Sequence, residues 1–380
     1  MYFRISKNLT QLFITVMRNI FLSAFFSCLS FISFSQSTNF YITGKVINAE
    51  TRAALQGASV FAENTTIGTA TDAEGNFRLL LPNGGYELVV TFTGFNTGTK
   101  RINSSDANDK SIVFDLNPKE KEMAVVSVVA TNEVKDGWNK YGLFFTEQFI
   151  GKTTNSTACT IKNREVLRFF FSKKRNRLKV MASEPLQIEN NALGYNIKYA
   201  LDSFTHEYAT QVSLYTGNPL FEEMTALNPG EQTKWQQARR EAYNGSILHF
   251  MRSVYSQQLK QEGFEIQFVV NINGLDTALK LKNTYGALNY KKDDSTQTVE
   301  IIPNQSQVAV IYTKEKPAAA YLTENEKEST DFQFSVLSFL PKNTITIEQN
   351  GYYYEQNELT INEYWTWERV ADLVPYDYNP

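Results

Sequence analysis

The sequence predicts a mainly β fold in two parts, a seven-stranded β-sandwich near the N-terminus and a larger mixed β region with a helical insertion. Aromatic residues make up 13% of the chain, with 27 Phe and 20 Tyr, and aromatic side chains favour strands. Residues 40–116 alternate apolar and polar positions between closely spaced turns, which is typical of a sandwich. Residues 231–243 are instead rich in polar residues, and residues 245–261 repeat their apolar positions at helical spacing, which predicts a helical insertion near 231–262.

Turn residues divide the first part into short strands. Asp72 to Asn76 place Gly75 where a turn needs a positive φ, and Gly84 and Gly85 follow Pro82 in the same way. Seven strands are therefore expected, at 40–47, 58–63, 68–71, 76–80, 86–92, 97–102 and 111–116.

Six short motifs in this part resemble the carboxypeptidase-regulatory-like domain. The motifs are GKV at 44–46, LQGASV at 55–60, TTIGTATD at 65–72, GNF at 75–77, YEL at 86–88 and GF at 94–95. The resemblance implies a transthyretin-like sandwich that has no catalytic residues of its own and often precedes other envelope domains in Gram-negative bacteria. Most of these residues have structural reasons to be present, so the resemblance implies fold more than activity.

Residues 1–36 are typical of a secretory signal peptide. Arg4, Lys7 and Arg18 form a basic leader without acids, an apolar run spans 20–34, and Ser35 and Gln36 end it. The run is short for a membrane span. The leader is long, so Met17 is an alternative start, and an uncleaved anchor is the alternative to cleavage. No span is expected after the signal, although membrane association stays open.

Charge and cysteine content limit the function classes. Cleavage after the signal would leave 34 basic and 40 acidic residues, a net charge of −6, which is unsuited to general nucleic-acid binding. It would also remove Cys28 and leave Cys159 without a partner for a disulfide.

The second part, 132–380, follows a linker at 117–131 that includes an apolar strand at 125–129. Strands are expected at 166–172, 177–182, 195–201, 204–214 and from 264 to about 348, helices near 231–262, and a last helix from 364 that Pro375 ends. This part is similar to the remainder of exported two-part proteins that carry the regulatory-like domain, a region to which the resemblance attaches no activity. The resemblance rests on segments at 149–151, 183–186, 193–195, 242–246 and 249–252, on Trp138 and on the terminal Trp-rich stretch.

The residues predict no catalytic constellation, no metal site and no cofactor. The only histidines, His206 and His249, lie outside any zinc-peptidase frame. Ser246 and His249 lie one helical turn apart, so they could approach each other as the nucleophile and base of a serine hydrolase do. However, Ser246 lies at the N-terminus of a predicted helix, where a serine is expected to cap free backbone N–H groups.

Two further candidates have structural explanations as well. Cys159 has no neighbouring base and is expected to be a buried structural thiol. Asp72, Glu74 and Asn76 alternate around Gly75 like a fragment of a calcium loop, yet supply too few oxygens for calcium. We expect a hairpin turn there.

A basic cluster is the most unusual charge feature. Eight basic residues lie between 162 and 179, with Glu165 as the only acid. We expect a hairpin over 168–180 whose tip offers Lys173, Lys174, Arg175 and Arg177 as contacts for an anionic glycan, a lipopolysaccharide phosphate or an acidic protein. The alternative is a solvated tip whose charges protect the aromatic strand at 169–171 from edge pairing.

The sequence therefore favours a non-catalytic, exported protein of the cell envelope, in the periplasm or associated with the outer membrane. It would bind or scaffold an envelope protein or glycan. A hydrolase acting on peptide or glycan, with its site in 132–380, and an accessory subunit of an outer-membrane transport or assembly system are the alternatives.

Overall fold

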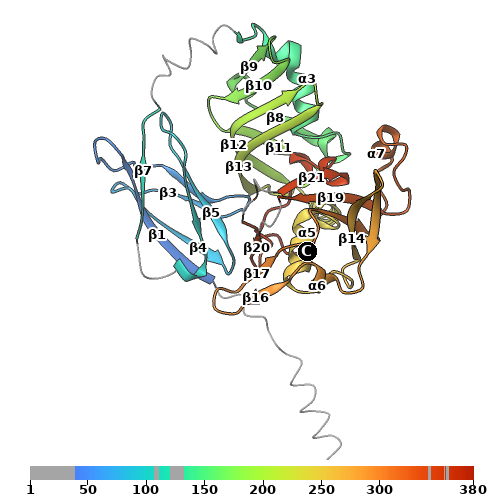
Figure 1. Cartoon of the computed structure of the whole chain (residues 1–380). Helices are drawn as coiled ribbons and strands as arrows, with labels where there is room; N and C mark the ends of the chain where they lie inside the picture. Colours follow the sequence, from blue (N-terminus) through green and yellow to red (C-terminus); the bar gives the residue numbers. More distant parts are fainter. Residues whose placement is uncertain (1–38, 107–110, 120–131, 341–343, 355, 357–358) are drawn as a thin grey trace, which may run out of the picture. The chain divides into compact units, whose positions relative to one another are not determined.

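The computed structural model describes residues 39–106, 111–119, 132–340, 344–354, 356 and 359–380. The expected signal at 1–36 and the expected strand at 125–129 lie outside these residues. The prediction of a mainly β fold is confirmed, because strands dominate and helices are few (Figure 1). No helix in the described ranges is long and apolar enough to cross a membrane.

The seven expected strands of the first part form a two-sheet sandwich. Side chains of β1 (Asn39–Asn48) alternate between the surface and the interior, since successive residues of a strand face opposite sides. One sheet has the order β4-β1-β7 and the other β3-β2-β5-β6. Their inner faces share one core, which contains Ile42, Val60 and Leu88. The other strands are β2 (Ser59–Ala62), β3 (Gly68–Ala70), β4 (Asn76–Pro82), β5 (Tyr86–Thr91), β6 (Gly98–Ile102) and β7 (Ile112–Leu116).

A six-stranded antiparallel sheet begins the second part. Its order is β8-β11-β12-β10-β9, with β13 paired to β12. Helix α3 (Gly137–Phe149), which the sequence did not predict, lies against this sheet (Figure 1) and buries Phe145 and Phe149 in its core. The strands are β8 (Cys159–Ile161), β9 (Leu167–Ser172), β10 (Arg177–Ala182), β11 (Leu186–Asn190), β12 (Tyr195–Glu207) and β13 (Val212–Glu223).

Two further sheets and helix α5 (Ile247–Tyr255) enclose a separate core. The sheets have the orders β15-β14-β18-β19-β21 and β16-β17-β20. Phe250, Met251 and Val254 on one side of α5 enter this core, as the helical spacing predicts. The strands are β14 (Phe264–Ile272), β15 (Leu275–Lys280), β16 (Lys291–Asp293), β17 (Thr298–Ile301), β18 (Gln307–Tyr312), β19 (Gln333–Phe339), β20 (Ile345–Ile347) and β21 (Leu359–Glu363). The remaining helices are α4 (Pro229–Tyr243), α6 (Thr284–Ala287) and α7 (Ala319–Glu324), with 3-10 turns η1 (Ser104–Asp106), η3 (Asn155–Ala158), η4 (Arg164–Val166), η6 (Tyr364–Thr366) and η7 (Val370–Asp372).

Two expected elements differ in the structure. The strands expected at 195–201 and 204–214 are the continuous β12, with a register shift between Leu201 and Ser203, followed by β13. The expected last helix is wrong, because residues 367–369 separate η6 from η7 and Arg369 among them is extended. The reason is that Trp365 packs into the core around α5 whereas Val370 packs into the core under α3. One continuous helix would not serve both cores.

The sandwich contacts the second part through the loop after β2. Thr65 forms an isolated parallel β-bridge with Leu220 on β13, and the N–H of Phe221 donates to Thr65 O at 2.9 Å. Phe61 and Val89 pack on the Leu220 side chain. Residues 39–380 accordingly form one compact unit.

Candidate functional site

His206 is part of the core under α3. Its Nδ1 lies 2.9 Å from Ser213 Oγ, which donates to Gln148 Oε1 at 2.9 Å; this chain of bonds assigns the ring proton to Nδ1. The rings of Phe144 and Tyr208 meet the imidazole edge-on, with centroids 4.7 and 4.5 Å away. Burial lowers the pKa of His206, so the neutral form is favoured and the side chain acts as a packing element.

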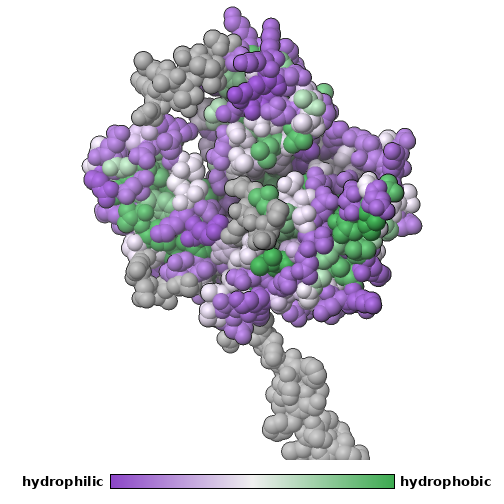
Figure 2. Space-filling model, viewed as in Figure 1, coloured by the Kyte–Doolittle hydropathy of each residue, from purple (hydrophilic) through white to green (hydrophobic). Residues whose placement is uncertain are grey.

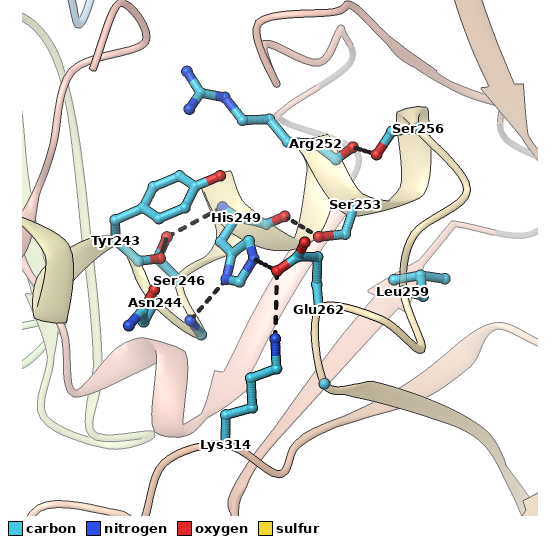
Figure 3. Close-up of polar contacts among 12 residues, drawn as sticks. Tyr243, Asn244, Ser246, His249, Arg252, Ser253, Ser256, Leu259, Glu262 and Lys314 are labelled. Atoms are coloured by element: carbon cyan, nitrogen blue, oxygen red, sulfur yellow. Dashed lines mark hydrogen bonds and ion pairs between the residues drawn. The ribbon is translucent and has the colours of Figure 1, made fainter. Parts of the chain in front are cut away.

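The Ser246–His249 pair does not have the geometry of a nucleophile and its base. Ser246 Oγ donates to Tyr243 O at 2.7 Å and accepts the backbone N–H of His249 at 3.2 Å (Figure 3). The hydroxyl is therefore a helix cap, as the sequence predicted. A hydrolase would instead need this hydroxyl bonded to the imidazole.

The His249 ring is held by its own partners. The N–H of Gly245 donates to Nδ1 at 3.1 Å, which leaves the proton on Nε2, 3.3 Å from Glu262 Oε2 (Figure 3). Lys314 Nζ lies 3.5 Å from the same carboxylate oxygen. Burial lowers the pKa of His249. The ring thus links the start of α5 to the turn before β14, and one carboxylate is too few for the zinc site that a peptidase needs.

The thiol and the acidic turn are also accounted for by local structure. Cys159 is half-buried, and burial, with Asp372 nearby, raises the pKa of its thiol to about 12; a reactive cysteine would need the opposite shift. Asp72 Oδ1 accepts the N–H of Glu74 at 3.0 Å and of Asn76 at 2.7 Å, so this carboxylate closes a turn. Across the described ranges, no three His, Cys, Asp or Glu side chains converge as a metal site would require.

The expected basic hairpin is present. β9 and β10 pair in register from Leu167 opposite Ala182 to Ser172 opposite Arg177, and residues 173–176 form the turn. Asn176 takes a φ of 45° and its carbonyl accepts the N–H of Tyr208 at 3.1 Å. β9 is the outermost strand of its sheet, so the charges are also placed where they would discourage edge pairing.

The fold separates the basic cluster into paired and unpaired charges. Arg168 bonds Glu133, Lys162 bonds Glu189 at 2.7 Å, and Arg177 bonds Glu207 at 3.1 Å. Arg164 and Lys179 make no ion pair with any described residue. The same holds for Lys173, Lys174 and Arg175, which are adjacent and exposed at the turn. We call these three residues the tip cations. The surface over β9 and β10, at the top of Figure 2, is correspondingly hydrophilic.

Half-buried aromatic rings lie beside the tip cations, a feature the sequence analysis missed. Tyr141 on α3 stacks on Phe171 with centroids 6.0 Å apart, and Phe171 meets Tyr208 edge-on at 6.0 Å. These rings come from three separate segments of the chain, so no local sequence motif predicts that they lie together. Phe171 lies two residues before Lys173, and the N–H of Tyr208 donates to Asn176 O, so both residues lie close to the turn that carries the tip cations.

Comparison with known proteins supports the resemblance of the first part. Residues 42–128 match the model of the CarboxypepD_reg-like domain. No curated protein matches the sequence.

Similarities to solved structures are weak. A DUF3823 family protein from Bacteroides ovatus covers 50% of this chain and 83% of its own at 14% identity, with a TM-score of 0.16. One from Parabacteroides merdae covers 48% and 82% at 10% identity, with a TM-score of 0.18. A 9R-lipoxygenase from Cyanothece covers 59% and 49% at 9% identity, with a TM-score of 0.15. Similarities this weak carry no information on function.

Proposed function

We propose, from the carboxypeptidase-regulatory-like domain at residues 42–128 and the basic hairpin that follows it, that this chain is an exported, non-catalytic binding or scaffolding protein of the cell envelope. The domain belongs to a family without catalytic residues of its own. The hairpin supplies the contact, and its ligand is an anionic glycan, a lipid phosphate or an acidic protein surface.

Export is supported by the sequence at 1–36. A basic leader without acids precedes an apolar run at 20–34, which is the pattern of a secretory signal. In this proposal the mature protein works in the periplasm or against the outer membrane. Detection of the mature N-terminus in an envelope fraction would test it, and an intact leader on cytoplasmic protein would contradict it.

One observation carries the binding role: three adjacent cations are exposed on one turn without ion pairs, whereas Lys162, Arg168 and Arg177 of the same cluster are paired. Three like charges on one turn repel one another, so they do not stabilise the fold. Their mutual repulsion is relieved when an anion binds, and charge-assisted hydrogen bonds to phosphate or carboxylate are among the stronger polar contacts.

The test compares co-purification from envelope fractions for two triple variants. Lys173→Ser, Lys174→Ser and Arg175→Ser remove the tip cations. Lys260→Ser, Lys282→Ser and Lys327→Ser remove the same charge from exposed residues outside the hairpin. We expect the first variant to lose its partner and the second to keep it, with wild-type binding weakened by salt. Unchanged partners in the tip variant would overturn the proposal.

A further inference from the structure

A cavity of about 440 Å³ lies between helix α4, strand β13, the loop after β2 and residues 375–380. It is far larger than one water molecule, whose share of liquid volume is about 30 Å³, and it is within the size range of small-molecule sites. None of the tip cations lines it.

Tyr195 places an unused hydroxyl at this cavity. The residue is 1% exposed, lines the cavity, and its hydroxyl has no hydrogen-bond partner among the described residues. Burial raises the pKa of Tyr195, so the hydroxyl keeps its proton. The hydroxyl oxygen is not among the buried atoms that lack a partner, so it is open to the cavity, where a ligand atom can bond it.

Arg239 lies beneath the ring of Tyr195 and is a built part of the same wall. It is 5% exposed, and its guanidinium carbon lies 3.9 Å from the centre of the Tyr195 ring. Its Nε and Nη2 donate to the carbonyls of Leu193 and Gly194, at 2.7 and 3.1 Å, and Nη1 donates to Glu223 at 3.0 Å. These three bonds leave two of its five N–H groups for a ligand.

The rest of the wall offers donors and acceptors in balance. Gln232, Gln236 and Arg240 follow one another at four-residue spacing on α4 and face the cavity together. Asp377 is held in place by Thr66, whose backbone N–H lies 3.0 Å from Oδ1. The two arginines and two carboxylates that line the cavity cancel in formal charge.

We propose that this cavity binds a neutral saccharide of one or two sugar units. A hydroxyl group both donates and accepts hydrogen bonds, so one sugar can accept from Tyr195, Arg239 or Arg240 while it donates to Glu223 or Asp377. The side-chain charges of this wall sum to zero, so a ligand with a net charge would gain no net attraction from them. The proposal is independent of the tip cations, since the two sites share no residue.

The test is a titration of the full chain, by saturation-transfer NMR and calorimetry, with methyl glycosides of glucose, galactose, mannose and N-acetylglucosamine. Galacturonic acid and alanine serve as the anionic and zwitterionic comparisons. We expect at least one neutral glycoside to bind at millimolar concentration and both comparisons to bind more weakly. No binding of any neutral glycoside, or tighter binding of galacturonic acid or alanine, would overturn the proposal.

Single-residue variants test whether the sugar binds in this cavity. Tyr195→Phe removes only the unpartnered hydroxyl, so we expect unchanged or higher stability and about threefold to tenfold weaker sugar binding, the effect of one hydrogen bond. Tyr290→Phe is the matched control: its hydroxyl donates to Tyr255 O at 2.9 Å outside the cavity, so stability should fall and sugar binding should not.

Two more variants keep the test decisive. Gln236→Ala changes an exposed helix residue and should weaken sugar binding without affecting folding. This variant therefore still tests the site if Tyr195→Phe folds poorly. The triple tip variant should bind sugar like the wild type, so failure at one site is distinguishable from failure at the other. Wild-type affinity in both Tyr195→Phe and Gln236→Ala would overturn the assignment.

Discussion

Ser246 Oγ lies 3.2 Å from the backbone nitrogen of His249 and caps helix α5 with this contact. The same spacing in sequence would suit a hydrolase, so the cap explains a residue pair that otherwise suggests catalysis. The cap also leaves His249 free to bond Gly245 and Glu262.

Removal of this cap should destabilise the protein without any catalytic consequence. We expect Ser246→Ala to lower the free energy of unfolding by about 0.5–2 kcal/mol, the usual cost of a lost N-cap. Ser246→Asn should restore most of it, because Asn also caps helices well. Urea unfolding measures both variants, and equal stability of Ser246→Ala and wild type would contradict the assignment.

Glu63 should make stability depend on pH in an unusual direction. Burial, with Glu87 and Asp202 nearby, raises its pKa from 4.5 to about 7. The folded protein therefore holds this proton at pH values where the unfolded chain has released it, and stability should fall as the pH rises from about 4.5 to about 7.

The variant Glu63→Gln removes this ionisation. We expect a higher melting temperature than wild type at pH 8, by about 2–4 °C for each kcal/mol regained, and little difference near pH 4.5. Glu50→Gln removes the same charge from an exposed turn and should change little at either pH. A pH-independent difference between Glu63→Gln and wild type would contradict this account.

The hairpin at 167–182 was predictable because its signals are local. A run of aromatic residues defines β9, alternating apolar residues define β10, and a run of polar residues marks the turn between them. The ion pairs that separate its charges were not predictable, because Glu133 lies 35 residues from Arg168 and Glu207 lies 30 residues from Arg177. A sequence window therefore indicates a uniform basic cluster, whereas the fold pairs three of its eight charges and leaves the three at the turn exposed and unpaired.

Helix α3 was missed because two glycines weaken its propensity. Gly137 and Gly142 both lie in the helix and both are buried, although glycine disfavours a helix interior by about 1 kcal/mol relative to Ala. A Cβ at Gly137 would lie 2.6 Å from the Cβ of Phe169. Close packing of α3 against β9 therefore requires a glycine at position 137, although the low helix propensity of glycine argues against a helix there. The cavity beside Tyr195 was missed for a similar reason, since its wall combines segments more than 100 residues apart.

Glu363 ends β21 with a backbone conformation that side chains rarely adopt. Its φ of 64° and ψ of −133° fall in a region used almost only by glycine, at a cost of about 1–3 kcal/mol. Its side chain is exposed and makes no ion pair with a described residue, so the strain is not offset by such a contact.

We expect Glu363→Gly to be more stable than Glu363→Ala by about 1 kcal/mol, because relief of strain exceeds the 0.5–1 kcal/mol that glycine loses through its freer unfolded chain. Thr360, an exposed residue earlier in the same strand, supplies the matched pair. There Thr360→Gly should be less stable than Thr360→Ala, since ordinary strand backbone gives glycine no advantage. Chemical denaturation of the four variants measures both differences, and the same order at the two positions would show that Glu363 is unstrained.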